Sequence, residues 1–463
     1  MQQRPHSYEQ QAAPSAADSP GTASRAVVIG AGVAGLLAAV ALAPSFDEVV
    51  ILERDRLTPE QTGRPGVPQA SHPHGLLVQG LKSMERLLPG IQEEMRAAGA
   101  PVVDLGEKLA LSARGHSTPP RTTGLRAQFF SRPFLESHVR ARTLSLPRIR
   151  LQDGTTVTGL STTDGSQITG VHTQKAHGEK EETVRADLVI DASGRSSRTP
   201  RWLTGLGYRV PPNHVIDSKI GYATASLDGS TTLQRDRCQS IYEVGQMGTL
   251  GRGAVWAVQE NGRSVITVFG RDSDRPGSDL AGFKADIRRL GNPLLIGAAD
   301  SLAPDTPIHR YAQLFNRCHR YHTMSPWPQR FLVVGDATYA LNPLYGQGMT
   351  VAALQAETIR TAAPRLNEHP ARTRAVQRSL ARRARLSWVI ATAQDSRWTE
   401  QPPAYGRVLG WLLDRMLDRV MHSSHLHVAF LKTMNLIAPL SLLSPRALAA
   451  LLAPANTRHG AGS

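Results

Sequence analysis

Three glycines and a glutamate near the N-terminus have the types and the spacing to bind a dinucleotide. Gly30 permits a tight turn after an apolar run, Gly32 lets the backbone approach a pyrophosphate, and Gly35 lets the following helix pack closely. Glu53 ends a second apolar run 23 positions after Gly30, close to the ~20 expected for the acid that accepts hydrogen bonds from an adenosine ribose. Arg54 follows it and weakens the exclusion of a 2′-phosphate. This unit predicts a dinucleotide site without choosing between NAD, NADP and FAD.

A second glycine-rich turn lies in the last third of the chain, in the stretch FLVVGDATYALNPLYGQGMT at residues 331–350. An apolar strand over residues 331–334 precedes Asp336, whose carboxylate can accept hydrogen bonds from ribityl hydroxyls. The backbone of residues 343–348 can lie against a flat ring, and a helix is predicted from about residue 349 to 363 with its N-terminus directed at that ring. A nicotinamide dehydrogenase does not need this second turn, whereas FAD extends beyond the reach of the first. The two turns are therefore predicted to bind opposite ends of one FAD.

The residues of the second turn divide into two groups by expected role. Reduced flavin carries negative charge near N1 and the C2 carbonyl, which a helix N-terminus stabilises. Gln347 either contacts the flavin edge or caps the following helix. The positions expected to shape the face of the flavin are Pro343, Gly346 and Gln347, and those expected to bind the cofactor here are Gly335, Asp336, Gly348 and Met349. No acid or base residue is assigned.

The combination of motifs resembles the flavoprotein monooxygenases built on the para-hydroxybenzoate hydroxylase fold, over most of the chain. The resemblance implies that Arg132, in FFSRPFLESHVRART, contacts FAD, and that the strand GTTVTGL lies near the adenine around Val157. Gly194, in DASGRSS, matches the glycine of the family's middle motif, which is associated with both FAD and NADPH. Ser193 stands where the family has an aspartate, and Asp191 lies two places earlier. NADPH or NADH is the expected electron donor, either directly or through a separate flavin reductase.

A narrower resemblance joins three stretches, GRPGVPQASHPHGLLVQGLKSMERLLPG at residues 63–90, DASGRSS and ATYALNPLYGQGM. Together they are similar to bacterial olefin epoxidases of polyether antibiotic pathways and, more loosely, to squalene epoxidase. The resemblance implies that reduced FAD and O2 form a C4a-hydroperoxide, whose distal oxygen passes to a carbon–carbon double bond of a lipophilic polyketide or terpenoid intermediate. The protein then supplies position, a dry pocket and hydrogen bonds.

The histidine-containing loop within the first of these stretches has two interpretations. His72 and His74 are two residues apart with no third ligand nearby, so a flavin contact or a structural hydrogen bond is favoured over a metal, and no metal site is assigned. Arg64 and Gln69, in the same loop, either approach the ring or the pyrophosphate or serve the loop itself. His309, Arg310 and Tyr311 precede the last FAD segment and could reach the cleft.

The predicted fold class is α/β, with a Rossmann-like FAD-binding domain. This domain must be discontinuous in sequence, because its motifs bracket the other segments. An inserted β-rich substrate domain contains a hairpin signal at Asn261-Gly262. Tyr222, Trp256 and Phe269 stand on its predicted strands, where each either lines a lipophilic substrate pocket or packs in the core. The predicted parts are a disordered tail at 1–24, the FAD-binding domain at 25–105, 131–206 and 327–399, the substrate domain at 106–130 and 207–326, and C-terminal helices at 400–463.

Composition limits the expected partners and location. The chain of 463 residues carries a formal net charge of +15, but its arginines do not form one dense run with interleaved aromatics, so nucleic acid is not an expected partner. An acidic acyl carrier protein stays open as a partner. Cys238 and Cys318 fit neither a disulfide framework nor a zinc site, which favours a reducing cytoplasm. No uninterrupted apolar stretch reaches the ~18 residues of a membrane span.

Other activities fit parts of the same pattern. An enzyme of this fold that hydroxylates an aromatic ring needs a group that helps to remove a phenolic proton, and the sequence identifies none. A second alternative is a flavin reductase that saturates isoprenoid double bonds, as geranylgeranyl reductases do. Oxygen consumption tied to product formation would distinguish a monooxygenase from such a reductase. A flavin halogenase is disfavoured, because the stretch SPWPQR has one tryptophan and lacks the two-tryptophan motif of that family. From a different class, a non-catalytic flavoprotein could use its positive charge to hold an acidic carrier protein.

Overall fold

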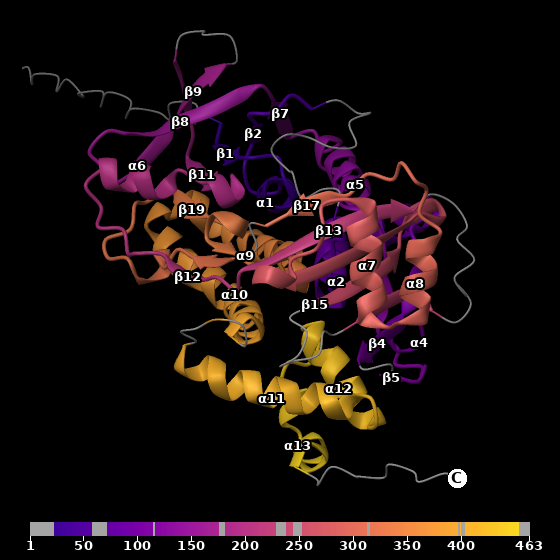
Figure 1. Cartoon of the computed structure of the whole chain (residues 1–463). Coiled ribbons are helices and arrows are strands. Elements are labelled where there is room, and N and C mark those ends of the chain that lie inside the picture. The colour runs from indigo at the N-terminus through magenta and orange to yellow at the C-terminus, as the bar shows by residue number, and fades with distance from the viewer. Residues whose placement is uncertain are drawn as a thin grey trace, which may run out of the picture.

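The structure is a computed structural model that describes residues 23–57, 72–113, 116–175, 181–227, 238–243, 252–312, 315–396, 399 and 403–452. These residues form a mixed α/β fold built around a five-stranded sheet and a seven-stranded sheet (Figure 1). Most of the tail predicted at 1–24 lies outside the described residues. Ser24 corrects its boundary, because the backbone N–H and the hydroxyl of Ser24 both donate to Asp47 Oδ2, at 2.8 and 2.9 Å.

The five-stranded sheet is parallel, with strand order β19-β11-β1-β2-β7. Its strands are β1 (Arg25–Ile29), β2 (Glu48–Leu52), β7 (Ile149–Gln152), β11 (Leu188–Asp191) and β19 (Phe331–Val333). The central strands are apolar on both faces, as a parallel sheet covered on both sides requires. β1, β11 and β19 each lead into one of the predicted motifs. Because these three strands are neighbours, their carboxyl ends bring Gly30, Ser193 and Gly335 to one edge of the sheet.

Helices cover one face of this sheet and a small antiparallel sheet covers the other. The helical side consists mainly of α1 (Val33–Leu42), α5 (Arg132–Leu144) and α9 (Gly348–Glu368), which share a core with Val28 and Ile51. The other side is the sheet β10-β9-β8, formed by β8 (Thr155–Thr162), β9 (Ile168–Lys175) and β10 (Glu182–Arg185), which packs on Val27 and Val50. Successive strand residues therefore enter opposite cores. Helix α9 was expected to end near residue 363 but continues through Pro364.

The seven-stranded sheet has the order β17-β13-β16-β15-β14-β4-β5 and carries the predicted hairpin. Its strands are β4 (Leu109–Ala113), β5 (His116–Ser117), β13 (Ile220–Leu227), β14 (Ser240–Glu243), β15 (Arg252–Val258), β16 (Ser264–Arg271) and β17 (His309–Tyr311). β15 and β16 pair antiparallel around a turn in which Asn261 and Gly262 both have positive φ, which confirms the hairpin. α7 (Leu280–Leu290) and α8 (Pro293–Asp300) pack on one face of this sheet (Figure 1).

The remaining elements connect and extend these layers. They are α2 (Val78–Leu87), α3 (Ile91–Ala97), α4 (Leu105–Lys108), α6 (Thr199–Gly205), the paired strands β3 (Val102–Asp104) and β6 (Arg126–Gln128), and the sheet of β12 (His214–Ile216), β18 (Asn316–Cys318) and β20 (Tyr339–Ala340). The last sheet matters for the site, because β20 leads directly into residues 343–348 of the second glycine-rich turn. The pairing of β20 with β18 fixes this part of the turn.

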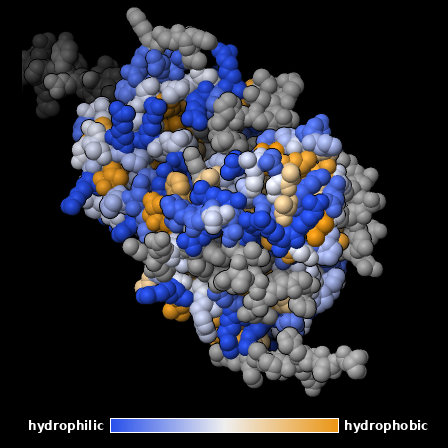
Figure 2. Space-filling view, in the orientation of Figure 1, coloured by the Kyte–Doolittle hydropathy of each residue, from blue (hydrophilic) through white to orange (hydrophobic). Residues whose placement is uncertain are grey.

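The chain ends in helices, as the sequence predicts. They are α10 (Thr373–Ser396), α11 (Ala404–Val420), α12 (Ser424–Met434) and α13 (Pro445–Leu452), the last three forming the yellow part of Figure 1. Trp411 on α11 and Leu440 after α12 are large exposed apolar side chains. The face shown in Figure 2 is otherwise mostly hydrophilic, with separated apolar patches. Among the described helices, none has the length and apolar character needed to traverse a bilayer.

Candidate active site

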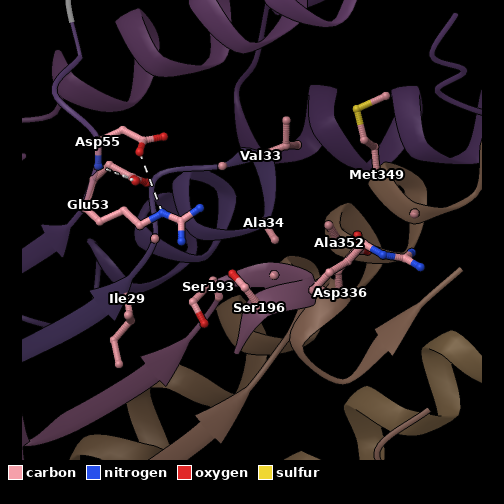
Figure 3. Close-up of a pocket in the computed structure, with 18 of the residues that line it drawn as sticks. Ile29, Val33, Ala34, Glu53, Asp55, Ser193, Ser196, Asp336, Met349 and Ala352 are labelled. Atoms are coloured by element: carbon pink, nitrogen blue, oxygen red, sulfur yellow. Dashed lines mark hydrogen bonds and ion pairs between the residues drawn. The ribbon is translucent and has the colours of Figure 1, made fainter. Parts of the chain in front are cut away.

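A cavity of about 550 Å³ opens where the three motif-bearing strands end. Its walls come from the loops after β1, β11 and β19, from strand β8, and from the start of helices α5 and α9. Figure 3 shows Glu53 on one side of it, Asp336 and Met349 on the other, and Ser193 and Ser196 between them. The two glycine-rich turns therefore face one shared cavity, although they are about 300 residues apart in the sequence.

The predicted cofactor and flavin-face residues meet at this cavity with one exception. Those that line it are Gly30, Gly32, Glu53, Arg54, Arg132, Val157, Gly194, Gly335, Asp336, Pro343, Gly346, Gln347, Gly348 and Met349. The exception is Gly35, which lies beneath the loop. A Cβ built on Gly35 would stand 1.8 Å from the carbonyl oxygen of Gly30, so the absence of a side chain there allows α1 to approach β1. Gly30 itself has φ +99° and would place a Cβ 2.8 Å from the carbonyl oxygen of Ala192.

Glu53 is buried and holds the first loop from below. Its Oε2 accepts a hydrogen bond from the backbone N–H of Ala31 at 2.7 Å, and its Oε1 accepts one from the N–H of Asp55 at 3.0 Å. Helix α1 begins at Val33, and its N-cap residue Gly32 provides no side-chain cap, so the first-turn N–H groups at the wall of the cavity have no side-chain partner there. This end of the cavity thus combines a helix N-terminus with a carboxylate, a combination suited to a pyrophosphate and a ribose.

The middle motif differs from the family pattern in a way that the structure explains. Asp191 is fully buried at the end of β11 and does not line the cavity. Its Oδ1 accepts from the N–H and the hydroxyl of Ser193, at 2.9 and 2.6 Å, and its Oδ2 accepts from the hydroxyls of Ser197 and Thr199, both at 2.5 Å. The carboxylate is used to fold its own turn, while Ser193 and Gly194 are presented to the cavity.

Asp336 provides the carboxylate of the second turn. It lines the cavity, where burial raises the pKa of its carboxyl group and the guanidinium groups of Arg195, Arg132 and Arg317 act in the opposite direction. The backbone N–H of the preceding Gly335 is held by Gln355 Oε1 of α9 at 2.8 Å. A carboxylate in this setting can accept hydrogen bonds from hydroxyl groups while the surrounding cations offset its charge.

The side chain of Gln347 does not cap helix α9, so the capping interpretation is wrong. Gln347 is the residue at the N-cap position, but its side chain makes no hydrogen bond to the helix. Its side chain is 1% exposed, and its Oε1 has no hydrogen-bond partner among the described residues. A buried acceptor without a partner, at the wall of a cavity, fits a ligand that carries an N–H group. The isoalloxazine ring of FAD carries one.

The histidine loop forms another wall. The Nδ1–H of His74 donates to the carbonyl oxygen of His72 at 2.8 Å, which leaves Nε2 without a hydrogen, and burial lowers the pKa of His74 to about 3. Nδ1 of His72 is hydrogen-bonded to the hydroxyl of Thr224 at 2.8 Å, and burial lowers the pKa of His72 to about 4. Both rings are therefore neutral near pH 7. The described residues contain no group of three or more potential metal ligands, and Arg64 and Gln69 lie outside them.

The three predicted substrate residues are separated by the seven-stranded sheet. Tyr222 pairs with Phe269 across β13 and β16, and the two share a face. The ring of Tyr222 lies 4.5 Å from His72 and 5.7 Å from Tyr311, and Tyr311 lines the cavity. Trp256 is corrected: it pairs with Ile266, faces the other way and is buried in the core under α7 and α8. It therefore contributes to packing and not to a shared pocket.

Arg195 is one of the cavity residues that the sequence did not single out, although it stands inside the quoted motif DASGRSS. Its guanidinium donates to the carbonyl oxygens of Leu341 at 3.2 Å and Phe315 at 2.8 Å, and it lies over the Phe315 ring at 4.8 Å. It thereby ties the middle motif to the start of the second turn. Its position directly after the motif glycine was the available signal, but an arginine there is equally consistent with a solvent-exposed side chain.

Comparisons with known proteins agree with this geometry. Residues 23–362 match the model of a family described as FAD binding domain. The chain is 30% identical over 439 residues to Protein Rv3254 of Mycobacterium tuberculosis, covering 90% of each. It is 32% identical to squalene monooxygenase 1,1 of Brassica napus over 199 residues, 43% of this chain and 36% of that one.

A solved flavoprotein/dehydrogenase from Cytophaga hutchinsonii superposes with a TM-score of 0.69 at 13% identity, covering 92% of this chain and 96% of its own, which shows a shared fold. The cavity and its glycine-rich loops fit FAD, since each turn combines the N-terminus of a helix with a carboxylate. The chain therefore belongs to the FAD binding domain family of FAD-dependent monooxygenases.

Proposed function

We propose that the protein is an FAD-dependent monooxygenase that epoxidises carbon–carbon double bonds of a lipophilic polyketide or terpenoid intermediate. The observation that carries the proposal is the wall where the cavity meets the seven-stranded sheet. Tyr311 lines the cavity there and packs against Tyr222 and His72, which lie buried behind it in one aromatic cluster, and burial raises the pKa of both tyrosines and lowers that of His72. All three side chains are uncharged near pH 7, so they suit an apolar substrate.

Each part of the cavity has a proposed role in holding FAD. Glu53 and the N-terminus of α1 bind the adenosine ribose and the pyrophosphate, Arg132 contributes positive charge, and Asp336 accepts hydrogen bonds from the ribityl chain. The ring lies against Pro343 to Gln347. When bound, reduced FAD supplies the activation of O2 for the transfer of one oxygen atom. The chain's own contribution is to orient the ring and to exclude water from the aromatic wall.

The electron donor is proposed to be NADPH or NADH acting through a separate flavin reductase. The family's middle motif places an aspartate where this chain has Ser193. The nearest carboxylate, Asp191, is fully engaged with hydroxyl groups of its own turn. No carboxylate of this motif is thus presented to an incoming nicotinamide cofactor among the described residues. A substrate tethered to an acyl carrier protein is compatible with the net charge of +15.

Aromatic hydroxylation is the second candidate, and His74 bears on it. The Nε2 atom of His74 carries no hydrogen, and His74 lines the cavity, so this nitrogen is a candidate acceptor for the proton of a phenolic substrate. However, a pKa of about 3 makes it a weak base that would not retain a phenolic proton near pH 7. This disfavours a phenol and supports an olefin, whose epoxidation needs no such base.

The test is product formation with isotopically labelled oxygen. The purified protein is incubated with FAD, a flavin reductase, NADPH, a polyene and 18O2, and the products are analysed by mass spectrometry. The expected product contains one 18O atom per oxidised double bond and forms only in the presence of the protein. An anaerobic incubation is the control. A product that gains two hydrogens without oxygen would instead show a double-bond reductase, and oxidation of phenols but not polyenes would show an aromatic hydroxylase.

A further inference from the structure

A carboxylate outside the known motifs contacts the second turn. Asp395 lies near the end of helix α10 and is fully buried. It accepts hydrogen bonds from Asn316 Nδ2 at 2.5 Å, from Asn342 Nδ2 at 3.2 Å, and from the hydroxyl of Tyr345 at 2.5 Å. Asn342 and Tyr345 flank Pro343, so one side chain of α10 holds both sides of the turn that lines the cavity.

The two amide groups cannot rotate to satisfy each other. Oδ1 of Asn316 already accepts from the backbone N–H of Asn342 at 2.8 Å, and Oδ1 of Asn342 accepts from the N–H of Leu344 at 3.1 Å. Both oxygens are thus committed to the backbone, and both NH2 groups must point toward position 395. The tyrosine hydroxyl adds a third donor, so the site favours a group with two acceptor oxygens. A carboxylate provides both, whereas an amide provides one.

The network joins parts of the chain that are distant in sequence. Asn316 belongs to strand β18, Asn342 and Tyr345 belong to the turn after β20, and Asp395 comes from α10. The family match ends at residue 362, so it includes the turn but not the carboxylate that holds it. Leaving these donors, two on buried residues and one on the partly buried Tyr345, without an acceptor would cost free energy in the folded state.

We propose that Asp395 is a positioning residue that fixes the Asn342–Tyr345 turn, and through it Pro343, Gly346 and Gln347, in the arrangement that receives the flavin ring. The inference rests on the proposed placement of that ring against the turn. Asp395 does not line the cavity and so acts through the residues that it holds. Loss of the carboxylate should change how tightly FAD binds and the environment of its ring, without removing any direct contact.

The experiment compares two variants that each neutralise a buried carboxylate. Asp395→Asn places an NH2 group against at least one of the three donors. Asp286→Asn is the matched control, because Asp286 is 5% exposed, is bonded to Arg252 and to the N–H of Gly277, and does not line the cavity. FAD affinity is measured by quenching of FAD fluorescence, and the ring environment by visible circular dichroism. We expect about tenfold weaker FAD binding and an altered flavin spectrum for Asp395→Asn only.

Tyr345→Phe keeps the inference testable if Asp395→Asn does not fold. It removes one donor and leaves the carboxylate with its two amides, so a smaller change of the same sign is expected in both measurements. Unchanged affinity and spectrum in these variants would overturn the proposal, as would equal losses in Asp286→Asn. Failure to oxygenate a polyene would contradict the proposed function alone, because FAD binding and the flavin spectrum are measured without substrate.

Discussion

The two turns at the ends of the cavity are each held by a buried carboxylate, but the carboxylates differ in where they come from. Glu53 binds backbone N–H groups of Ala31 and Asp55, within one strand–helix–strand unit. Asp395 binds side chains of Asn316, Asn342 and Tyr345, the nearest of which is 50 residues away. The first turn is thus fixed by its own backbone, and the second by side chains from three elements.

This difference predicts different weaknesses. A backbone-fixed turn depends on close approach of main chains, so it is sensitive to an added methyl group and tolerant of changes elsewhere. A turn fixed by side chains depends on complete satisfaction of donors and acceptors, so it is sensitive to the loss of one acceptor far from it in the sequence. The adenosine end and the flavin end of the cavity should therefore respond to different substitutions.

The largest effect is expected from Gly35→Ala, which breaks the first turn. The added Cβ would stand 1.8 Å from the carbonyl oxygen of Gly30, so α1 has to move away from β1. We expect no FAD binding and a free energy of unfolding lowered by about 3 kcal/mol or more, measured by urea denaturation. Gly205→Ala is the control, because a Cβ there meets nothing within 4 Å. Equal behaviour of the two variants would contradict the steric account of the first turn.

The pH dependence of stability isolates the carboxylate of the second turn. Burial raises the pKa of Asp395 from 3.8 to about 7, and Tyr345 is the titratable group bonded to it. A raised pKa in the folded state gives stability that is fully present below about pH 4 and lost as the pH rises through 7. The stability of the wild type minus that of Asp395→Asn should therefore fall by on the order of 3 kcal/mol between pH 4 and 7. A constant difference between their denaturation midpoints would show that Asp395 does not titrate there.

Asp336→Ala tests the cofactor contact of the second turn directly. Removal of the carboxylate takes away the proposed acceptor of the ribityl hydroxyls and leaves the arginines around it without an anion. We expect about 100-fold weaker FAD binding, seen as loss of the yellow colour during purification. Asp336→Asn keeps one acceptor oxygen and should lose less. A fully yellow Asp336→Ala protein would exclude the ribityl assignment.

Glu53→Gln sharpens the comparison, because it makes in the first turn the change that Asp395→Asn makes in the second. The amide turns one NH2 group toward the N–H of Ala31 or of Asp55. We expect roughly tenfold weaker FAD binding, measured by fluorescence, with an unchanged visible spectrum, since this end is proposed to bind the adenosine and not the flavin ring. A spectral change equal to that of Asp395→Asn would mean that the two turns do not act separately.

Much of the site followed from the sequence because its contacts close over short distances. The spacing of Gly30, Gly35 and Glu53 reflects one strand–helix–strand unit, whose geometry allows little variation. Asp336 and Gly348 likewise lie within one short segment, between the end of β19 and the start of α9. For the same reason the α/β class, the hairpin at Asn261 and the C-terminal helices were all predicted correctly, since each depends on a local pattern.

Other features depended on pairings that no local pattern specifies. Alternation along a strand shows that its residues face two sides, but only the register of Tyr222 with Phe269 and of Trp256 with Ile266 shows which side faces the cavity. The sequence by itself determined that two turns suited to FAD exist. The tertiary structure decided that they share a cavity, and that Asp395 holds the second of them, because buried donors select their acceptor by position in space and not by distance along the chain.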